Sequence, residues 1–395
     1  MDTIEIVKKN ECCGCGSCMQ KCPKNAISMI EDKEGFLIPV INKELCVNCG
    51  ICTKVCPQLK EKIKPKEDYP QAYAIYNKNA EELLKSSSGG MFSVIANYVL
   101  DNKGIVFGAA YNDDNEVNHI YVENKEDLQK LRNSKYVQSN INNTYKEVEK
   151  NLKENRLTLF TGTPCQVAGL KAYLMKEYEN LILVDIVCHG VPNQKVFKKY
   201  LEYLEGKFKS KIKTYNFRNK EQNGWGLYAK IETEDGKIRY KNSAFDPYYN
   251  AFLECKMYRE SCYNCHYTSF YRNSDITLAD YWGILSVHPE FYSEKGVSLV
   301  LINNKKGKEL LNRISEKIEY IETDLEKASQ KNMNLKRPSN RPKERNYIYN
   351  GINEKNSNQF IKENLKITYN PKKIIKAVVP YKVKLAVQKV RSNKK

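Results

Sequence analysis

Residues 12–23 read CCGCGSCMQKCP, and residues 46–57 read CVNCGICTKVCP. Both stretches have the spacing C-x2-C-x2-C-x3-C-P, so one cysteine pattern occurs twice within a short length of chain. Gly14, Gly16 and Gly50 stand between the cysteines, where a residue without a Cβ lets the backbone turn tightly and direct its N–H groups at sulfur. We expect the proline after each run to end a short helix. We call residues 12–57 the cassette.

The repeated spacing is typical of proteins that bind two [4Fe-4S] clusters, in which the fourth cysteine of each run ligates the cluster of the other run. The predicted ligands of the first cluster are Cys12, Cys15, Cys18 and Cys56. Those of the second cluster are Cys46, Cys49, Cys52 and Cys22. Cys13 is left over, and we interpret it as an unligated neighbour of the ligands.

Two zinc ribbons and a disulfide framework are the alternatives to iron–sulfur clusters. A zinc site needs four ligands and no third evenly spaced cysteine, and a disulfide framework is typical of a secreted chain. No basic segment followed by an apolar core opens the sequence, so we expect no signal peptide. With 14 cysteines and no export signal, we expect reduced thiols in the cytoplasm.

The length of 395 residues suits two or three domains. We predict an α/β protein with α+β elements, in which a dicluster ferredoxin-like domain (1–60) is joined by a linker (61–70) to a flavin-binding domain. That domain is predicted as a mixed, largely parallel sheet in two parts (71–150 and 151–320), because strands, loops and helices alternate along it. Residues 321–395 are predicted to form a surface segment and a basic tail.

The formal net charge is +18, and residues 371–395 hold nine lysines and arginines and no acidic residue. Because the charge excess is local and no groove-reading motif occurs, we predict no nucleic-acid binding. Val383, Val387 and Val390 fall on one helical face of the tail, which could lie on an anionic membrane surface. A disordered basic terminus is the alternative. We therefore expect a cytoplasmic protein, with peripheral contact to the inner membrane face as an option for the tail.

Six cysteines lie outside the predicted ligands of the cassette. Cys165 and Cys188 each follow a predicted buried strand, and the ends of parallel strands meet at one edge of a sheet. We predict a third [4Fe-4S] cluster held by Cys165, Cys188, Cys262 and Cys265, with Cys255 in reserve. The alternative is that the strand-end cysteines are small core residues and that the Cys262–Cys265 pair binds zinc or nothing.

Residues 86–90 (SSSGG) precede a predicted amphipathic helix over residues 91–101, and a helix N-terminus attracts anions. Phosphate binding and an ordinary serine cap are both open at this point. His189 and His266 lie beside proposed ligands, where a histidine could move a proton. His189 is the only candidate catalytic residue, and a structural role is the alternative for both histidines.

Seven motifs, in this order, carry a resemblance to the coenzyme F420 hydrogenase/dehydrogenase beta-subunit family, in the branch with an N-terminal two-cluster domain. They are CCGCGSC, SSSGGMFS, NSKYVQS, FTGTPCQVAGL, DIVCHGVPN, SCYNC and SDITLADYWG. The resemblance spans residues 5 to about 305. It implies an iron–sulfur flavoprotein that binds FAD. The residues that it implies for the FAD site are Ser87, Ser88, Gly89, Gly90, Lys135, Tyr136, Thr161, Gly162 and Thr163, with Lys135 as a phosphate partner.

The function that follows is an oxidoreductase that couples one-electron transfer through [4Fe-4S] clusters to two-electron or hydride transfer at FAD. The acceptor is coenzyme F420 or an unidentified small molecule, with polysaccharide metabolism as one setting. The expected partners are a ferredoxin-like or other redox protein and that small molecule. A non-catalytic electron-delivery subunit of a larger redox complex is the alternative, and a metal-binding regulatory or scaffold protein is a third reading.

Overall fold

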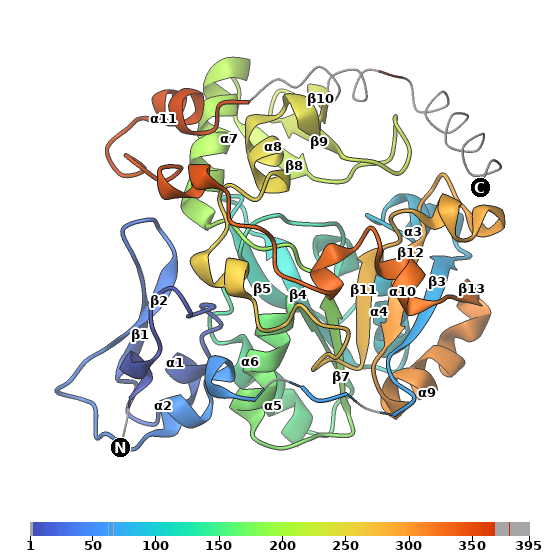
Figure 1. Cartoon of the computed structure of the whole chain (residues 1–395), viewed down its shortest axis with the longest axis horizontal. Coiled ribbons are helices and arrows are strands. Elements are labelled where there is room, and N and C mark those ends of the chain that lie inside the picture. Colours follow the sequence, from blue (N-terminus) through green and yellow to red (C-terminus); the bar gives the residue numbers. More distant parts are fainter. Residues whose placement is uncertain (1–2, 62, 66, 368–378, 380–395) are drawn as a thin grey trace.

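The structure is a computed structural model that describes residues 3–61, 63–65, 67–367 and 379. Figure 1 shows a small N-terminal module beside a large sheet, with a second, smaller sheet above it. The predicted tail helix at Val383, Val387 and Val390 lies outside the described residues. In the part of the chain that is described, no helix is both long enough and apolar enough to cross a membrane.

The N-terminal module is built from two short helices and one hairpin. Its elements are α1 (Ser17–Lys21), α2 (Ile51–Lys54), β1 (Ile27–Glu31) and β2 (Leu37–Ile41), and the two strands pair antiparallel. Gly16 and Gly50 precede the helices with φ of 74° and 72°, a backbone conformation that favours glycine. The two runs therefore fold alike, although Pro57 begins a 3-10 helix rather than ending α2.

The large sheet has eight strands in the order β13-β3-β12-β11-β7-β6-β4-β5. In chain order they are β3 (Gln71–Asn77), β4 (Ile105–Tyr111), β5 (Val117–Val122), β6 (Thr158–Gly162), β7 (Leu181–Ile186), β11 (Ile276–Asp280), β12 (Ser298–Ile302) and β13 (Ile318–Glu322). The four central strands β11, β7, β6 and β4 are parallel, and every outer strand pairs antiparallel. The mixed sheet is confirmed, with its parallel part limited to the centre.

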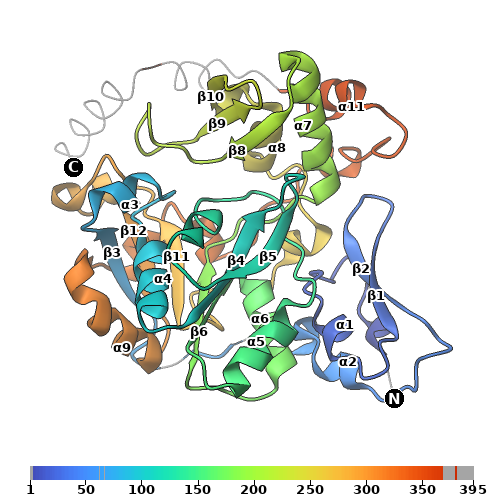
Figure 2. The same ribbon diagram turned by 180° about the vertical axis from the view of Figure 1, so that it is seen from behind.

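Helices cover both faces of the parallel strands, as Figure 2 shows from behind. The four helices are α4 (Met91–Asp101), α5 (Thr144–Lys153), α6 (Pro164–Leu174) and α9 (Lys305–Ile314). Along β7, Ile182 and Val184 pack with α4 and α9, whereas Leu181 and Leu183 pack with α5 and α6. A strand buried on both faces reads as a continuous apolar run, which is why the central strands could be predicted.

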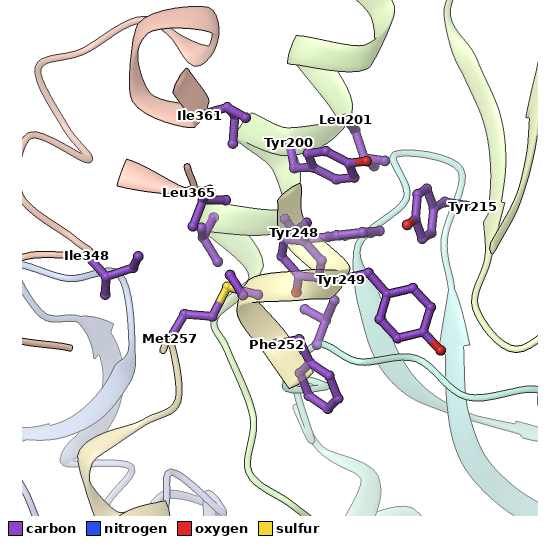
Figure 3. Close-up of a cluster of buried hydrophobic side chains, with 14 of the residues drawn as sticks. Tyr200, Leu201, Tyr215, Tyr248, Tyr249, Phe252, Met257, Ile348, Ile361 and Leu365 are labelled. Carbon is purple, nitrogen blue, oxygen red and sulfur yellow. The ribbon is translucent and has the colours of Figure 1, made fainter. Parts of the chain in front are cut away.

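The second sheet is antiparallel, in the order β10-β9-β8. Its strands are β8 (Ile212–Asn216), β9 (Tyr228–Thr233) and β10 (Ile238–Asn242), and it packs with α7 (Gln194–Phe208), α8 (Pro247–Leu253) and α11 (Ser357–Asn364). Figure 3 shows part of its aromatic core, including Tyr200, Tyr215, Tyr248 and Phe252. Tyr111, at the end of β4, packs against this core, so the small sheet sits over the carboxyl ends of the parallel strands.

The prediction of a surface segment after residue 320 was wrong for the part of the chain up to residue 367. Strand β13 continues to Glu322 in the large sheet. Beyond it, Leu335, Ile348, Phe360 and Ile361 are all buried. The polar composition of this stretch hides apolar side chains that are spaced widely along the sequence but gather in the cores of both sheets.

Candidate functional site

The structure brings together the four cysteines predicted to hold the second cluster of the cassette. Cys22, Cys46, Cys49 and Cys52 line one shared cavity between α2 and the β1–β2 hairpin. The backbone N–H of Ala26 donates a hydrogen bond to the sulfur of Cys22 (3.3 Å), as expected for a thiolate ligand that is stabilised by amide groups. Cys49 is exposed, so this end of the cassette faces solvent.

The four predicted ligands of the first cluster lie deeper in the protein than those of the second cluster. Burial first, and then the neighbouring Cys12 and Cys56, raise the pKa of the Cys18 thiol. Burial likewise raises the pKa of Cys56 to about 11. The backbone N–H of Gly14 donates to the sulfur of Cys12 (3.4 Å). Sulfurs this close in a buried space disfavour each other's negative charge, and positively charged iron would compensate for that charge, so the donor set fits a cluster.

Among the described residues, no three histidine, cysteine, aspartate or glutamate side chains converge closely enough to hold a single metal ion.

The predicted third cluster site is also assembled. Burial, and then Cys188 and Cys265, raise the pKa of the Cys262 thiol, so these three sulfurs are neighbours. A backbone amide lies near each sulfur and opposes the rise of its pKa, namely Gly190 at Cys188, Val191 at Cys262 and Tyr267 at Cys265. Amide donors at all three sulfurs are the feature that favours a cluster.

Cys165 completes this group from the first turn of α6. Its sulfur lies 3.1 Å from Oγ1 of Thr163. The neighbouring Cys13 thiol and burial are the main causes that raise its pKa, and the charge of Cys188 is a further one. Cys255 lies apart from the group. Its sulfur contacts Tyr258 and Ser339, and no cysteine is among the groups that shift its pKa. The four residues named as ligands are thus together, and the reserve residue is not.

Cys13 does not point away from the sulfur groups. Its thiol lies beside those of Cys15 and Cys165, and these two neighbours are the main causes that lower the pKa of Cys13. The cassette therefore meets the large domain with its buried half, and one thiol links a cassette cysteine to a cysteine of the third group. An added Cβ on Gly169 of α6 would lie 3.1 Å from the sulfur of Cys15, which shows how closely the two parts pack.

The predicted FAD residues lie in three segments, and the first two, 87–90 and 135–136, belong to connected loops at the carboxyl edge of the sheet. Ser134 donates hydrogen bonds from its backbone N–H (2.9 Å) and from its hydroxyl (3.1 Å) to Oγ of Ser87. Ser88 donates to the carbonyl of Val297 (3.0 Å), and the N–H of Gly89 donates to Oγ of Ser298 (3.0 Å). The loop that precedes α4 is therefore fixed to the adjacent loop and to β12.

Lys135 and Tyr136 lie next to this loop. The Lys135 ammonium donates to the carbonyl oxygens of Arg132 (2.6 Å) and Lys130 (3.1 Å), and burial lowers its pKa to about 7. Tyr136 stacks on Phe252 with ring centroids 4.2 Å apart. Both residues thus have partners within the protein, and the Lys135 side chain stabilises the loop to which it belongs.

Thr161, Gly162 and Thr163 end β6 and begin α6. Thr161 donates to the carbonyl of Phe107 (2.9 Å). Thr163 caps α6 together with Gln166 in a reciprocal capping box. These three residues therefore have structural roles beside the third cysteine group, because Thr163 also contacts the sulfur of Cys165.

Sequence reasoning missed a set of polar and aromatic residues beside Ser87 and Ser88. Arg218 and Lys220 follow β8, and both are buried. Arg218 donates to the carbonyl of Ser87 (3.2 Å), and Lys220 donates to the carbonyl of Ser88 (2.6 Å). Trp225 and Trp282 stack beside them with ring centroids 5.1 Å apart and an interplanar angle of 6°. The stretch LADYWG, which contains Trp282, was the one part of the sequence that pointed to this group of residues.

His189 and His266 fall in different places. His189 is exposed, and the surrounding protein lowers its pKa, while the carboxylate of Asp280 opposes that effect. It therefore lies between the third cysteine group and the Arg218 region. His266 is exposed in the wall of a cavity of about 970 Å³ that Cys265 also lines. None of the nine predicted FAD residues lines that cavity.

Comparisons with known proteins agree with the motifs. Residues 155–328 match the family described as the C terminus of the coenzyme F420 hydrogenase/dehydrogenase beta subunit. Residues 11–59 and 38–90 match two models of a 4Fe-4S dicluster domain. No curated protein matches the chain.

Among solved structures, one chain of the F420-reducing [NiFe] hydrogenase complex from Methanosarcina barkeri is similar. It is 17% identical, with 69% of this chain and 92% of that chain covered and a TM-score of 0.46. The family models match regions that carry the quoted motifs, and the protein is an iron–sulfur redox protein related to the coenzyme F420 hydrogenase/dehydrogenase beta subunit. The chain thus joins an N-terminal 4Fe-4S dicluster domain to a region, residues 155–328, that matches the C terminus of the coenzyme F420 hydrogenase/dehydrogenase beta subunit.

Proposed function

We propose that this protein is an iron–sulfur flavoprotein oxidoreductase that couples one-electron exchange with a protein carrier to two-electron reduction or oxidation of a small molecule, coenzyme F420 being one candidate. The observation that carries the proposal is the placement of Cys13 and Cys15 beside Cys165, where an added Cβ on Gly169 of α6 would lie 3.1 Å from the sulfur of Cys15. It supports a continuous series of sulfur groups from the cassette to the edge of the large sheet. When bound, the clusters would supply one-electron transfer and FAD would supply hydride transfer.

The series of sulfur groups has one end at the surface of the cassette and the other beside the predicted flavin loop. The loop around the exposed Cys49 is accessible to a protein carrier, whereas Cys13 and Cys15 are buried against the large domain. At the other end, Arg218 and Lys220 fix the carbonyls of Ser87 and Ser88 from one side. This leaves the first turn of α4 as the part of the site that can meet an anionic group.

The residues beside that loop can orient a flavin and control its protons. Asp280 compensates the charge of Arg218, and burial lowers the pKa of Lys220 to about 7. Protonated Lys220 then adds positive charge beside the loop, which favours a phosphate-bearing ligand. His189 is exposed near Asp280, with its pKa lowered by the surrounding protein, so it is neutral at pH 7 and can accept a proton. We propose His189 for that role.

The test is anaerobic reconstitution of the full chain with iron, sulfide and FAD. We expect bound flavin, acid-labile sulfide and iron, together with reduction of the flavin by reduced ferredoxin. Absence of flavin absorbance after gel filtration, or a bound flavin that reduced ferredoxin leaves oxidised, would contradict the proposal. Assays with F420 and with artificial acceptors then identify the class of small molecule.

A non-catalytic electron-delivery subunit is the second candidate, and one observation favours it. The polar groups of Ser87, Ser88 and Lys135 already have partners within the protein, so a flavin would have to replace or add to these contacts. For a protein of this kind, the purified chain would take up electrons from a carrier but would reduce no small acceptor unless a partner protein were added.

A further inference from the structure

Arg259 joins the cassette to the third cysteine group. Its backbone N–H donates to the carbonyl of Val191 (2.9 Å), and its own carbonyl accepts from the N–H of Cys262 (2.9 Å). The backbone of Arg259 therefore belongs to the same loops that direct amide groups at Cys188 and Cys262. Its side chain leaves these loops and extends into the cassette, where only 3% of the residue remains exposed.

The guanidinium group makes three hydrogen bonds in the cassette and beside it. Nε donates to the carbonyl of Cys12 (2.7 Å), and Nη2 donates to the carbonyl of Leu37 (2.6 Å). Nη1 donates to Oε1 of Gln138 (3.1 Å), whose amide in turn donates to the carbonyl of Cys13 (2.9 Å). One side chain thus fixes the loop that carries the first two cysteines of the cassette.

Gly14 shows how close this approach is. A Cβ at this position would lie 2.8 Å from Nη1 of Arg259, and the backbone φ of +67° already favours glycine. A guanidinium group packs flat against a peptide surface only where no side chain intervenes. The glycine that follows the Cys12–Cys13 pair is therefore explained by Arg259 as well as by the turn itself.

The charge of Arg259 has no carboxylate partner among the described residues, since no salt bridge includes it there. Its acceptors are two carbonyl groups and one amide. Arg345, by contrast, is a buried arginine with a carboxylate partner. It is 1% exposed, and its Nη1 and Nη2 lie 2.9 and 2.6 Å from the two carboxylate oxygens of Glu34. A buried cation without a counter-charge is costly, so Arg259 requires negative charge close by.

That negative charge is supplied by the sulfur groups on either side. The guanidinium group donates to the carbonyl of Cys12, and the N–H of Cys262 donates to the carbonyl of Arg259 itself. The field of one guanidinium therefore reaches the predicted ligands of the first cassette cluster and of the third cluster. A [4Fe-4S] cluster with four thiolates carries net negative charge, which increases on reduction.

We propose that Arg259 is a positioning residue that holds the first cassette cluster against the third cluster and, as their shared counter-charge, raises the reduction potentials of both. This rests on the proposed function, because it requires both clusters to be present. A cation stabilises the reduced, more negative state of each cluster, and its removal lowers both potentials. If a variant merely loosened the loop, water would enter and the reduction potentials would rise, because water stabilises added charge better than a buried site does.

The test is an EPR-monitored redox titration of the anaerobically reconstituted full chain. Arg259→Met removes the charge. We expect each of the two reduction potentials to fall by at least 59 mV, which corresponds to a tenfold change in the one-electron equilibrium constant. Arg259→Lys keeps the charge and should restore most of the shift. Arg259→Gln removes the charge but keeps amide donors for the carbonyls of Cys12 and Leu37, so it should repeat the fall if the methionine variant folds poorly.

The double variant Arg345→Met with Glu34→Gln is the matched control, because it removes a buried arginine from the contact between the cassette and the large domain together with the carboxylate that pairs its charge. We expect its cluster potentials to remain at the wild-type values. Unchanged or raised potentials in the neutral Arg259 variants, or an equal fall in the double variant, would overturn the proposal. Failure of the proposed function is distinguishable, since the wild-type protein would then bind no iron or sulfide at all.

Discussion

Arg218 and Asp280 form a bidentate salt bridge, with Nη1 and Nη2 of the arginine 2.5 and 2.7 Å from the two carboxylate oxygens. The same carboxylate accepts a hydrogen bond from Nε1 of Trp225 (2.7 Å), and Nη2 also donates to the carbonyl of Ser87. Asp280 ends β11, whereas Arg218 and Trp225 come from the loop between β8 and β9. This one ion pair therefore joins the two sheets beside the proposed flavin loop.

Replacing Asp280 by asparagine should leave the buried Arg218 cation without its counter-charge. We expect a loss of about 3–5 kcal/mol in the free energy of unfolding, measured by urea denaturation. Glu221→Gln is the control, because its salt bridge with Lys230 belongs to the small sheet but is exposed, and exposed pairs contribute about 0–1 kcal/mol. Equal losses in the two variants would show that the Arg218–Asp280 pair has no special role.

The same pair predicts a pH dependence. Burial raises the pKa of Asp280, but the Arg218 cation and its hydrogen bonds prevail and lower it below its usual value. A lowered pKa in the folded state means that the pair stabilises the protein above the ordinary pKa of aspartate, about 3.9, and that this stability is lost as pH falls through the folded-state value. Acid unfolding followed by circular dichroism should be less steep in Asp280→Asn than in the wild type.

Gly89 tolerates no side chain, because a Cβ would lie 2.3 Å from the carbonyl oxygen of Ile75 and 2.5 Å from the N–H of Ser298. Gly89→Ala should therefore displace the Ser87–Gly90 loop from β3 and β12, with a loss of about 1–3 kcal/mol in stability and weaker FAD binding. Urea denaturation and flavin fluorescence titration measure the two effects.

A glycine in open space provides the comparison. Gly206 lies within α7, and an added Cβ there meets nothing within 4 Å. Gly206→Ala should stabilise the protein by up to about 1 kcal/mol, because alanine favours a helix over glycine, and should leave flavin binding unchanged. A Gly89 variant with wild-type stability and flavin affinity would refute the role of close packing at this loop.

Lys135 predicts a rise in stability with pH. Burial lowers its pKa to about 7, whereas the ordinary lysine value is about 10.4. Between these two values the unfolded chain binds a proton that the folded chain has released, so stability rises with pH by up to about 1.4 kcal/mol per unit. Lys135→Met should remove this slope in urea denaturation between pH 7 and pH 10. Lys153→Met, at an exposed lysine of α5, should keep it.

Local spacing was enough to predict the cassette, because its two runs fold on their own backbone turns. Cys165 and Cys188 could be placed together from topology, since the strands before them are buried, parallel and adjacent in the sheet. The start of α4 followed from the serine and glycine run before a periodic helix, although its N-cap is Gly90 and no serine side chain caps it. These predictions depend on contacts that are local, or on a rule that applies to every parallel sheet.

Arg218 and Arg259 could not be found in this way. Their partners, Asp280 and Cys12, lie far away in the sequence, and a single arginine in a basic chain carries no signal of its own burial. The prediction of a surface segment after residue 320 failed for a related reason. Its buried Leu335 and Phe360 are separated by long polar stretches, so no periodicity marks them, and only the docking of the segment on both sheets makes them core residues.

The third cluster can be tested separately from catalysis by counting iron. Cys262 lies among Cys188 and Cys265 with an amide donor at its sulfur, whereas Cys255 faces Tyr258 and Ser339. Both residues are partly buried cysteines of the same segment, so serine replaces each with a similar change in volume. Cys262→Ser should therefore remove the third cluster, and with it about four iron atoms per chain, while the EPR signals of the two cassette clusters remain. Cys255→Ser should retain the full iron content. An unchanged iron content in Cys262→Ser, or an equal loss in Cys255→Ser, would place the third cluster elsewhere, because a cubane that has lost one thiolate ligand is no longer held at all four corners.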